Sequence, residues 1–300
     1  MSMEENEVLN PSQKSVLEHL GAKFTDRPLF SETLQQELKS ELTLRLSKFQ
    51  SSIPDSDTLY ISKFHLNQIM RCERQFIADR EKPFEWSVPT VRGLVSHKAI
   101  ELSVFWRQDI DPLSLVDEAL NRCSNGDDTL AKWIHTLSDG DHSQLRSDVN
   151  NRVGAFLESW PPLKKEWTPM LEAPVRAEFA EGKIILSGKV DLSLGKPYGN
   201  TAGKVLIDFK TGAFYPSHRE DLRFYALLES IRLGVPPRMV ATYYLDRSDF
   251  SIEHVTENVL EAALFRIEDG VERIVNVLFG DAEPKGCSSK WCELCNEENA

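Results

Sequence analysis

The pattern of apolar and polar positions predicts helices in the first half of the chain. Within residues 31–50 the leucines recur at helical spacing, and the polar segment 51–57 that follows reads as a linker. Further helices are predicted from Ser62 to a break near Pro83 and Pro89, from about Val91, at 112–122 and at 143–160.

After Pro169 the pattern changes to short apolar runs that are typical of strands. Two runs separated by Glu181-Gly182 predict a β-hairpin, and a later amphipathic stretch predicts a long last helix. The predicted elements are the hairpin 171–179 and 184–194, a strand at 205–209, a helix at 219–233, a strand at 240–245 and a helix at 259–278.

The composition is that of an ordinary globular chain, with 300 residues, 41% hydrophobic and 27% charged. The formal net charge of −12 excludes a uniformly basic surface that coats nucleic acid, so any contact with nucleic acid must be local. No apolar run approaches the roughly 20 residues of a membrane span. We therefore expect a cytoplasmic protein that does not contact membranes.

Three of the five cysteines fall close together near the C-terminus. Cys292 and Cys295 form a C-x-x-C pair, and Cys287 is near enough to join them, which favours a metal or cluster over chance. Three thiolates require a fourth ligand, for which Cys72 and Cys123 are the candidates. A redox-inert terminal thiol pair is the alternative.

The densest chemistry lies on the hairpin and the strand that follows it. Asp208 and Lys210 are two residues apart on a strand, so their side chains share one face while Phe209 turns towards the core. If Asp191 lies on a paired strand, its carboxylate can share a divalent ion with Asp208, and oxygen ligands suit Mg²⁺ or Mn²⁺. A surface salt bridge is the alternative for Asp208 and Lys210.

Three further residues are candidate ligands or neighbours of the ion. His97 and Glu101 are one helical turn apart and face the same side of their helix. Glu172, at the start of the first hairpin strand, is a further candidate metal ligand. A buried structural histidine and a solvated strand-end carboxylate are the alternatives.

The order of these motifs resembles the PD-(D/E)XK nuclease superfamily in its RecB-like branch. The matching residues are G93-x-x-x-H97, G188-x-x-D191, D208-x-K210 and a following helix with Tyr225-Ala226. One cysteine before the histidine motif and three at the C-terminus are similar to the iron-sulfur variant, found in the CRISPR-associated exonuclease family and in AddB-type nuclease domains.

This resemblance, which covers roughly Ser62 to Cys295, implies an α/β fold with a restriction-endonuclease-like core in which helices flank a mixed central sheet. The helical pattern of the first half adds a large helical N-terminal part, so we expect a helical N-terminal extension over 1–60 and a nuclease domain over 61–300. It implies that a Mg²⁺ or Mn²⁺ ion is held by His97, Asp191, Asp208 and the Phe209 carbonyl, and that Lys210 is catalytic. Cys72, Cys287, Cys292 and Cys295 would hold a 4Fe-4S cluster, with zinc as the alternative.

The implied activity is metal-dependent hydrolysis of DNA phosphodiesters from ends, in repair, recombination or CRISPR-type processing. DNA that is single-stranded or has free ends would be the substrate, and a helicase or CRISPR adaptation proteins would be partners. Tyr225 would lie by the DNA, and the stretch Ile61–Arg107, with eight Lys or Arg against five Asp or Glu, supplies a local basic patch. The candidate DNA contacts in it are Arg71, Arg74, Arg92 and Lys98.

Three features depart from the family pattern. Asp221 stands where the family has glutamine, and the terminal cysteines are spaced by four and then two residues instead of two and then about five. The helical part before the first strand, about 150 residues, is also long for the minimal fold. A catalytically weak or inactive DNA-binding or scaffold protein with the nuclease fold, stapled by a cluster or zinc, is therefore the alternative function.

Overall fold

The computed structural model describes residues 9–106, 111–126, 128–290 and 292–296. The first eight residues of the predicted extension lie outside this range. In the part described, no helix is long and apolar enough to cross a membrane. The helices of the first half are α1 Pro11–Leu20, α2 Leu34–Ser47, α3 Lys63–Arg71, α4 Glu73–Glu81, α5 Val88–Phe105, α6 Pro112–Ser124, α7 Thr129–Ile134 and α8 Asp139–Ser159.

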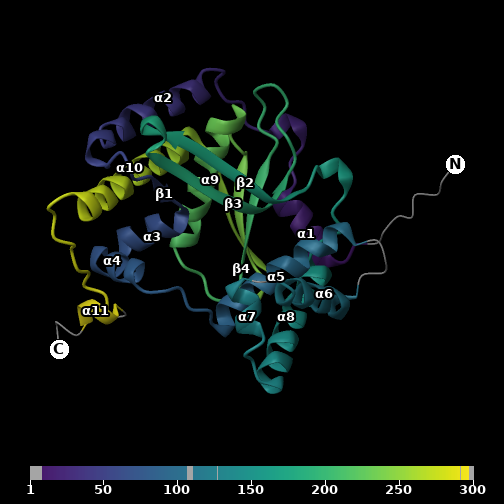
Figure 1. The fold of residues 1–300 in the computed structure, drawn as a ribbon. Coiled ribbons are helices and arrows are strands. Elements are labelled where there is room, and N and C mark those ends of the chain that lie inside the picture. The colour runs from purple at the N-terminus through teal and green to yellow at the C-terminus, as the bar shows by residue number, and fades with distance from the viewer. Residues whose placement is uncertain (1–8, 107–110, 127, 291, 297–300) are drawn as a thin grey trace.

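Most strands lie in the second half, where they alternate with two long helices (Figure 1). The strands are β1 Leu59–Ile61, β2 Met170–Phe179, β3 Ile184–Leu194, β4 Val205–Lys210, β5 Met239–Tyr244 and β6 Asp249–His254. The remaining helices are α9 Ser217–Leu233, α10 Glu257–Phe279 and the short C-terminal α11 Glu293–Asn296.

One mixed sheet contains these six strands, in the order β1-β3-β4-β5-β6, with β2 antiparallel to β3 on its other edge. Strand β3 has two partners on the same edge. Its first residues, 184–186, pair with β1, and its last residues, 192–194, pair with β4. Among the described strands, residues 187–191 of β3 therefore have no ladder partner on that edge, and this gap receives functional side chains.

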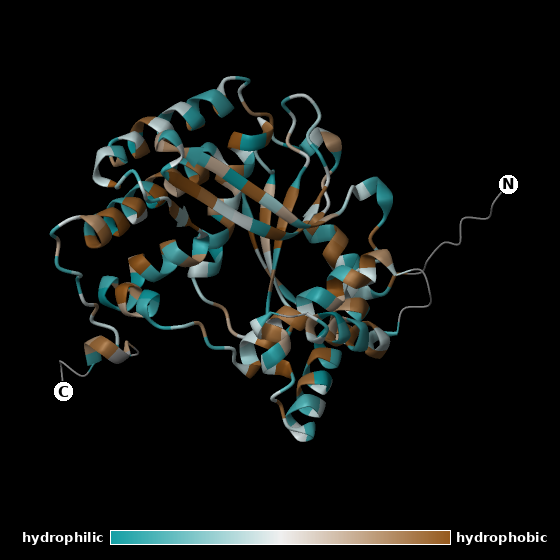
Figure 2. Cartoon of the chain, viewed as in Figure 1, coloured by the Kyte–Doolittle hydropathy of each residue, from teal (hydrophilic) through white to brown (hydrophobic). Residues whose placement is uncertain are grey.

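Alternation along β4 divides the core between the two faces of the sheet. Val205, Ile207 and Phe209 face a core closed by α1 and Trp160, whereas Leu206 faces the core formed with α2, α3, α9 and α10. Helices α5 to α8 form a third hydrophobic cluster of their own. Figure 2 shows the apolar colouring concentrated on the strands and on the inner sides of the helices around them. The predicted class, a mixed central sheet flanked by helices, is confirmed.

The hairpin, the two following strands and the two long C-terminal helices are confirmed with shifts of one or two residues. The prediction of one helix from Ser62 to Pro83 was wrong, because Cys72 takes an extended conformation (φ −166°) that ends α3 and starts α4. Pro89 does not break a helix but lies in the first turn of α5, where its missing N–H costs nothing. Strands β1 and β6 and helix α7 were not predicted, since each is too short or too polar for a clear period.

Helix α3 is held close to α10 because Gly270 has no side chain. A Cβ at Gly270 would lie 2.5 Å from Cδ2 of Leu66, and Leu66 is 2% exposed and has little room to move. Since α3 carries Lys63 at its start and Cys72 at its end, this contact positions both ends of the helix.

We expect Gly270→Ala to lower the free energy of unfolding by about 1–3 kcal/mol through overpacking. Gly154→Ala is the matched control, because nothing in the described chain lies within 4 Å of a Cβ added there in α8. That change should be neutral or stabilise by up to about 1 kcal/mol through helix propensity. Urea denaturation measures both, and equal effects of the two variants would contradict the packing argument.

Candidate functional site

The site begins where the β3–β4 ladder ends. The last paired residues are Leu192 and Ile207, and the next ladder donor on β4 is the N–H of Phe209. This N–H donates instead to Oδ2 of Asp191, at 2.7 Å. The Asp191 side chain thus replaces a backbone acceptor and is fixed between the two strands.

Asp208 lies on the adjacent position of β4 with no solvent exposure. Its Oδ1 accepts a hydrogen bond from Nζ of Lys63 at 2.7 Å, and its Oδ2 lies 2.6 Å from Nζ of Lys210. Burial alone would raise the pKa of Asp208, but the two ammonium groups outweigh it and hold this pKa well below its usual range. Asp208 is therefore a carboxylate, compensated by two cations.

Lys63 is the main site residue that sequence reasoning missed as such. It is the first residue of α3, directly after the N-cap Ser62 and strand β1. Its Nζ also lies 4.7 Å from the centroid of the Tyr225 ring. Burial disfavours the ammonium, yet Asp208 and other neighbouring acidic groups raise the pKa of Lys63 well above its usual value. The sequence signals were its place at the start of a helix and within the basic stretch 61–107, and neither pointed to Asp208.

Tyr225 is buried against β3, and its position explains Gly188. A Cβ at Gly188 would lie 2.6 Å from Cε1 of Tyr225, so the unpaired part of β3 must carry glycine there. Burial raises the pKa of Tyr225 to about 12. With 3% of its surface exposed, the ring supports Lys63 and does not face solvent. A DNA contact for Tyr225 stays a prediction.

His97 of α5 brings a nitrogen ligand to the carboxylates. Its Nδ1 lies 3.6 Å from Oδ2 of Asp191, and its ring packs edge-on against Phe209. One ligand atom from each of His97, Glu172 and Asp191 lies within 4.8 Å of the others. Glu172 is placed there by a left-handed backbone conformation (φ 48°) within β2.

The carboxyl groups of this trio are held in an environment that opposes their charge. Burial first, and then the charge of Asp191, raises the pKa of Glu172. Burial also raises the pKa of Asp191, and the nearby His97 only partly offsets it. A divalent cation would relieve both effects, and two carboxylates with an imidazole are ligands that Mn²⁺ or Mg²⁺ accepts. The donor set therefore fits such an ion.

The structure separates the predicted metal-site residues. His97 and Asp191 lie together with Glu172, whereas Asp208 is paired with the two lysines and is not part of that close trio of described residues. Phe209 turns its ring into the core against Trp160, as its alternation with Asp208 predicted. Its carbonyl as a metal ligand stays a prediction.

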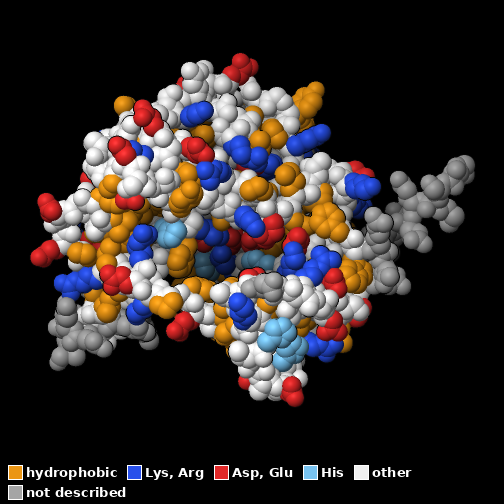
Figure 3. All heavy atoms as spheres, viewed as in Figure 1, with side chains coloured by type: hydrophobic (Ala, Val, Ile, Leu, Met, Phe, Trp, Pro, Cys, Tyr) orange, Lys and Arg blue, Asp and Glu red, His pale blue; other side chains and the backbone are white. Residues whose placement is uncertain are grey.

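Asp221 of α9, the residue that departs from the family pattern, lies in the same site. It is 6% exposed, and its Oδ1 accepts a hydrogen bond from the Asn67 side chain at 2.6 Å. Its Oδ2 lies 3.6 Å from Nζ of both Lys63 and Lys210. Two buried acids and two lysines thus form one charge-balanced group on this face of the sheet. Figure 3 shows a hollow between the β2–β3 layer and α5 with acidic, basic and histidine side chains around it.

The four cysteines predicted to share a site lie together. Sγ of Cys72 is 3.6 Å from that of Cys295 and 3.8 Å from that of Cys292, and all four sulfurs, with that of Cys287, lie within 4.8 Å of one another. Burial raises the pKa of Cys292, but hydrogen bonds from Cys295 and the other thiols outweigh it and lower this pKa to about 7. Cys123 lies elsewhere, packed against the cluster of α5 to α8.

Backbone contacts fasten the C-terminal segment to α4 beside these cysteines. The Lys285 N–H donates to Oε2 of Glu73 at 2.8 Å, and the Arg74 N–H donates to the Lys285 carbonyl at 3.3 Å. The cysteine group thus joins the junction of α3 and α4 to a segment more than two hundred residues further along the chain.

The four basic residues predicted to contact DNA fall into two pairs. Arg71 and Arg74 are exposed near the cysteines, and Nε of Arg74 donates to the Pro284 carbonyl at 3.3 Å. On α5, Arg92 pairs with Asp148 of α8 at 3.2 Å, and Lys98 pairs with Glu101 at 2.7 Å. Their contact with DNA stays a prediction.

No family model and no curated protein matches this chain. Among solved structures it is similar to one from Eubacterium rectale named "Putative exonuclease", at 16% identity and a TM-score of 0.47, over 80% of this chain and 88% of that one. A second similar structure, SSO0001, has 15% identity and a TM-score of 0.31, over 78% of this chain and 84% of that one.

We expect Lys63→Met to lower the free energy of unfolding by about 1.5–3 kcal/mol, because Asp208 loses a charged hydrogen bond while it stays buried. In an Asp208→Asn background the same change should cost at least about 1 kcal/mol less. Urea denaturation of the four proteins measures this coupling.

Lys39→Met, at an exposed position of α2, is the control and should change stability little. Equal costs of Lys63→Met with and without the Asp208→Asn change would show that the ion pair contributes nothing.

Proposed function

We propose that this protein is a metal-dependent DNA nuclease that hydrolyses phosphodiester bonds from strand ends. The observation that carries the proposal is the convergence of Asp191, Asp208 and Lys210 with His97 at the point where β3 and β4 separate. Acidic and imidazole ligands beside a lysine suit a reaction in which charge builds up on a phosphate. The resemblance to PD-(D/E)XK nucleases supports the same reaction.

In this proposal His97, Asp191 and Glu172 hold the divalent ion, Mg²⁺ or Mn²⁺, and Asp208 and the Phe209 carbonyl complete its surroundings. The bound ion supplies Lewis-acid chemistry to the phosphate. Lys210 and Lys63 stabilise the extra negative charge on the phosphoryl oxygens as water adds to phosphorus and the phosphorus–oxygen ester bond breaks. The proton released by the water ends on the departing oxygen or in solvent.

A catalytically weak or inactive DNA-binding or scaffold protein is the second candidate. It is favoured by the two ammonium groups that already compensate Asp208 and by the additional acid at Asp221, which repels a phosphate. Such a protein would bind DNA ends, alone or with a helicase or CRISPR adaptation proteins, without cleaving them.

For the cysteine group, the sulfur distances support a single tetrahedral zinc ion. Four sulfurs at about 2.3 Å from one ion lie about 3.8 Å apart, close to the 3.6 and 3.8 Å found here. A 4Fe-4S cluster binds each thiolate through a different iron and requires the sulfurs to lie farther apart. The separations thus fit zinc better than the cluster that the family resemblance implies.

We expect Mn²⁺-dependent release of nucleotides from linear DNA, with at least a roughly hundredfold loss in Asp208→Asn, Lys210→Ala and His97→Ala. Asp208→Asn keeps the shape of the side chain, so its loss would be chemical. The measurement uses labelled single- and double-stranded DNA with Mn²⁺ or EDTA, and circular DNA distinguishes end-dependent cleavage.

The exposed variant Lys39→Met should keep full activity. Binding of DNA without cleavage in any metal would favour the scaffold candidate, and cleavage undiminished in Asp208→Asn and Lys210→Ala would reject the assigned site.

Purified protein should contain about one zinc per chain and be colourless. Cys72→Ala should lose the metal and become protease-sensitive near its C-terminus, because the thiolates join α4 to that segment. Cys123→Ala is the matched control and should keep the metal. Elemental analysis after anaerobic purification distinguishes zinc from a cluster, since brown protein with about four irons per chain would establish the cluster instead.

A further inference from the structure

A second pocket lies on the other face of the sheet from the candidate active site and at the other end of β4. It has a volume of about 290 Å³ and is bounded by the end of α1, the turn Lys165–Trp167 and the first residue of β4, Val205. Val205 and Asp208 are three positions apart on a strand, so they face opposite sides and lie near opposite ends.

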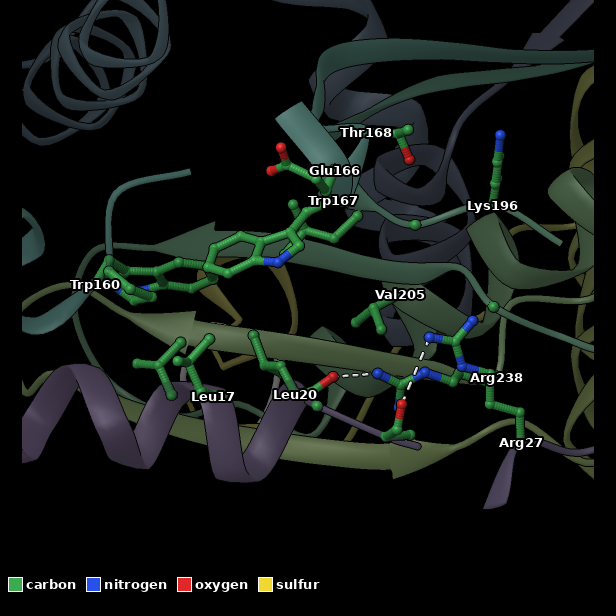
Figure 4. Close-up of a pocket in the computed structure, with 17 residues that line it drawn as sticks. Leu17, Leu20, Arg27, Trp160, Glu166, Trp167, Thr168, Lys196, Val205 and Arg238 are labelled. Atoms are coloured by element: carbon green, nitrogen blue, oxygen red, sulfur yellow. Dashed lines mark hydrogen bonds between the residues drawn. The ribbon is translucent and has the colours of Figure 1, made fainter. Parts of the chain in front are cut away.

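Two arginines from distant parts of the chain meet in this pocket. Arg238 directly precedes β5, and Arg27 follows α1. Figure 4 shows their guanidinium groups next to each other, below and to one side of the indole of Trp167. Arg238 is 6% exposed, and the Nε atoms of both arginines are buried without a hydrogen-bond partner among the residues that the structure describes.

Backbone carbonyls satisfy only part of this donor capacity. Arg238 donates to the Leu20 carbonyl at the end of α1, and Arg27 donates to the Ala22 carbonyl at 3.5 Å. A guanidinium has five N–H groups, so most of them remain available. Within the described ranges neither arginine pairs with a carboxylate, and the Glu166 side chain lies on the far side of Trp167 (Figure 4).

Arg238 is a buried cation with a second, partly buried cation beside it, and such a pair is unfavourable without an anion. The pKa of Arg238 is lowered to about 10, first by burial and then by the charge of Arg27. The negative C-terminal end of the α1 dipole stabilises one guanidinium, but it does not explain why a second one lies beside it. An anion that contacts both groups would remove this cost.

Most of the remaining side chains that line the pocket are apolar, with Glu166, Thr168 and Lys196 as the exceptions. Leu17, Leu20 and Val205 form one wall, and the indole of Trp167 lies above Leu17 and Leu20, to one side of the guanidinium groups (Figure 4). The side chain of Lys196 points away from the two arginines. A ligand here therefore needs an anionic end and a flat, mainly apolar body.

We propose that this pocket binds a small organic anion, with its phosphate or carboxylate on Arg27 and Arg238 and its aromatic body against Trp167. Nothing in this proposal depends on the reaction proposed for the other face of the sheet. The volume limits the ligand to about the size of a single nucleotide or an aromatic acid.

The test is titration of the full chain, in EDTA, with deoxyadenosine monophosphate, benzoate, inorganic phosphate and deoxyadenosine, followed by calorimetry and indole fluorescence. We expect at least one of the two organic anions to bind more tightly than inorganic phosphate and to perturb the fluorescence. The uncharged nucleoside should bind at least about tenfold more weakly than its monophosphate, because it lacks the charged hydrogen bonds to the arginines. Preference for the monophosphate or for benzoate distinguishes a phosphate ligand from a carboxylate ligand.

Arg27→Gln should weaken binding at least about tenfold through the loss of a charged donor, and Trp167→Ala should remove the fluorescence change. Lys39→Gln is the control, since it removes an exposed cation of α2 that does not line this pocket, and it should bind normally. Arg238→Gln is a poor test of binding, because it also removes the hydrogen bond to the Leu20 carbonyl that holds the end of α1. Absence of binding to all probes at millimolar concentration, or binding that Arg27→Gln leaves unchanged, would reject the proposal.

Discussion

The burial of one carboxylate, that of Asp208, is the constraint on which the arrangement around the site depends. A charge removed from water at the end of a central strand must meet opposite charge in contact, or its burial would cost several kcal/mol. Lys210 comes from the same strand two residues on, but Lys63 has to come from α3. The sheet, α3 and α9 are therefore brought together by chemistry as well as by their apolar faces, and Asp221 of α9 balances the second cation.

Helix α3 is short, and each of its ends is fixed for a different reason. Its first residue, Lys63, is held by Asp208, and the residue that ends it, Cys72, is held by three cysteines from the end of the chain. Between them Leu66 packs on Gly270 of α10. A metal at the cysteines would thus support the position of Lys63 through nine residues of helix, without contact with the candidate active site.

Local patterns in the sequence predicted most of the sheet and pointed to both groups of candidate ligands. The alternation of β4, the glycine turn of the hairpin and the cluster of three cysteines depend on residues close together in the chain, which a sequence shows directly. Lys63 and Asp208 are 145 positions apart, so their ion pair had no local signal. Glu172 joined His97 and Asp191 only through its left-handed backbone conformation, which no residue type at that position indicated. Asp208 lies apart from this trio because it pairs with Lys63 and Lys210, and the spacing of Asp208 and Lys210 along the strand did not indicate that.

Side chains alternate between the two faces of the sheet along β4, so this one strand contributes to a different site on each face. Its even positions carry Asp208 and Lys210, which face Lys63 and Asp221. Its odd positions place Val205 at the pocket of the two arginines and Phe209 in the aromatic core. Trp160 lies between the pocket of Arg27 and Arg238 and the candidate active site. It lines that pocket and packs edge-on against Phe209, and the Phe209 ring contacts His97. The face of the sheet opposite the charged group therefore supports the histidine, because the Phe209 ring lies between Trp160 and His97.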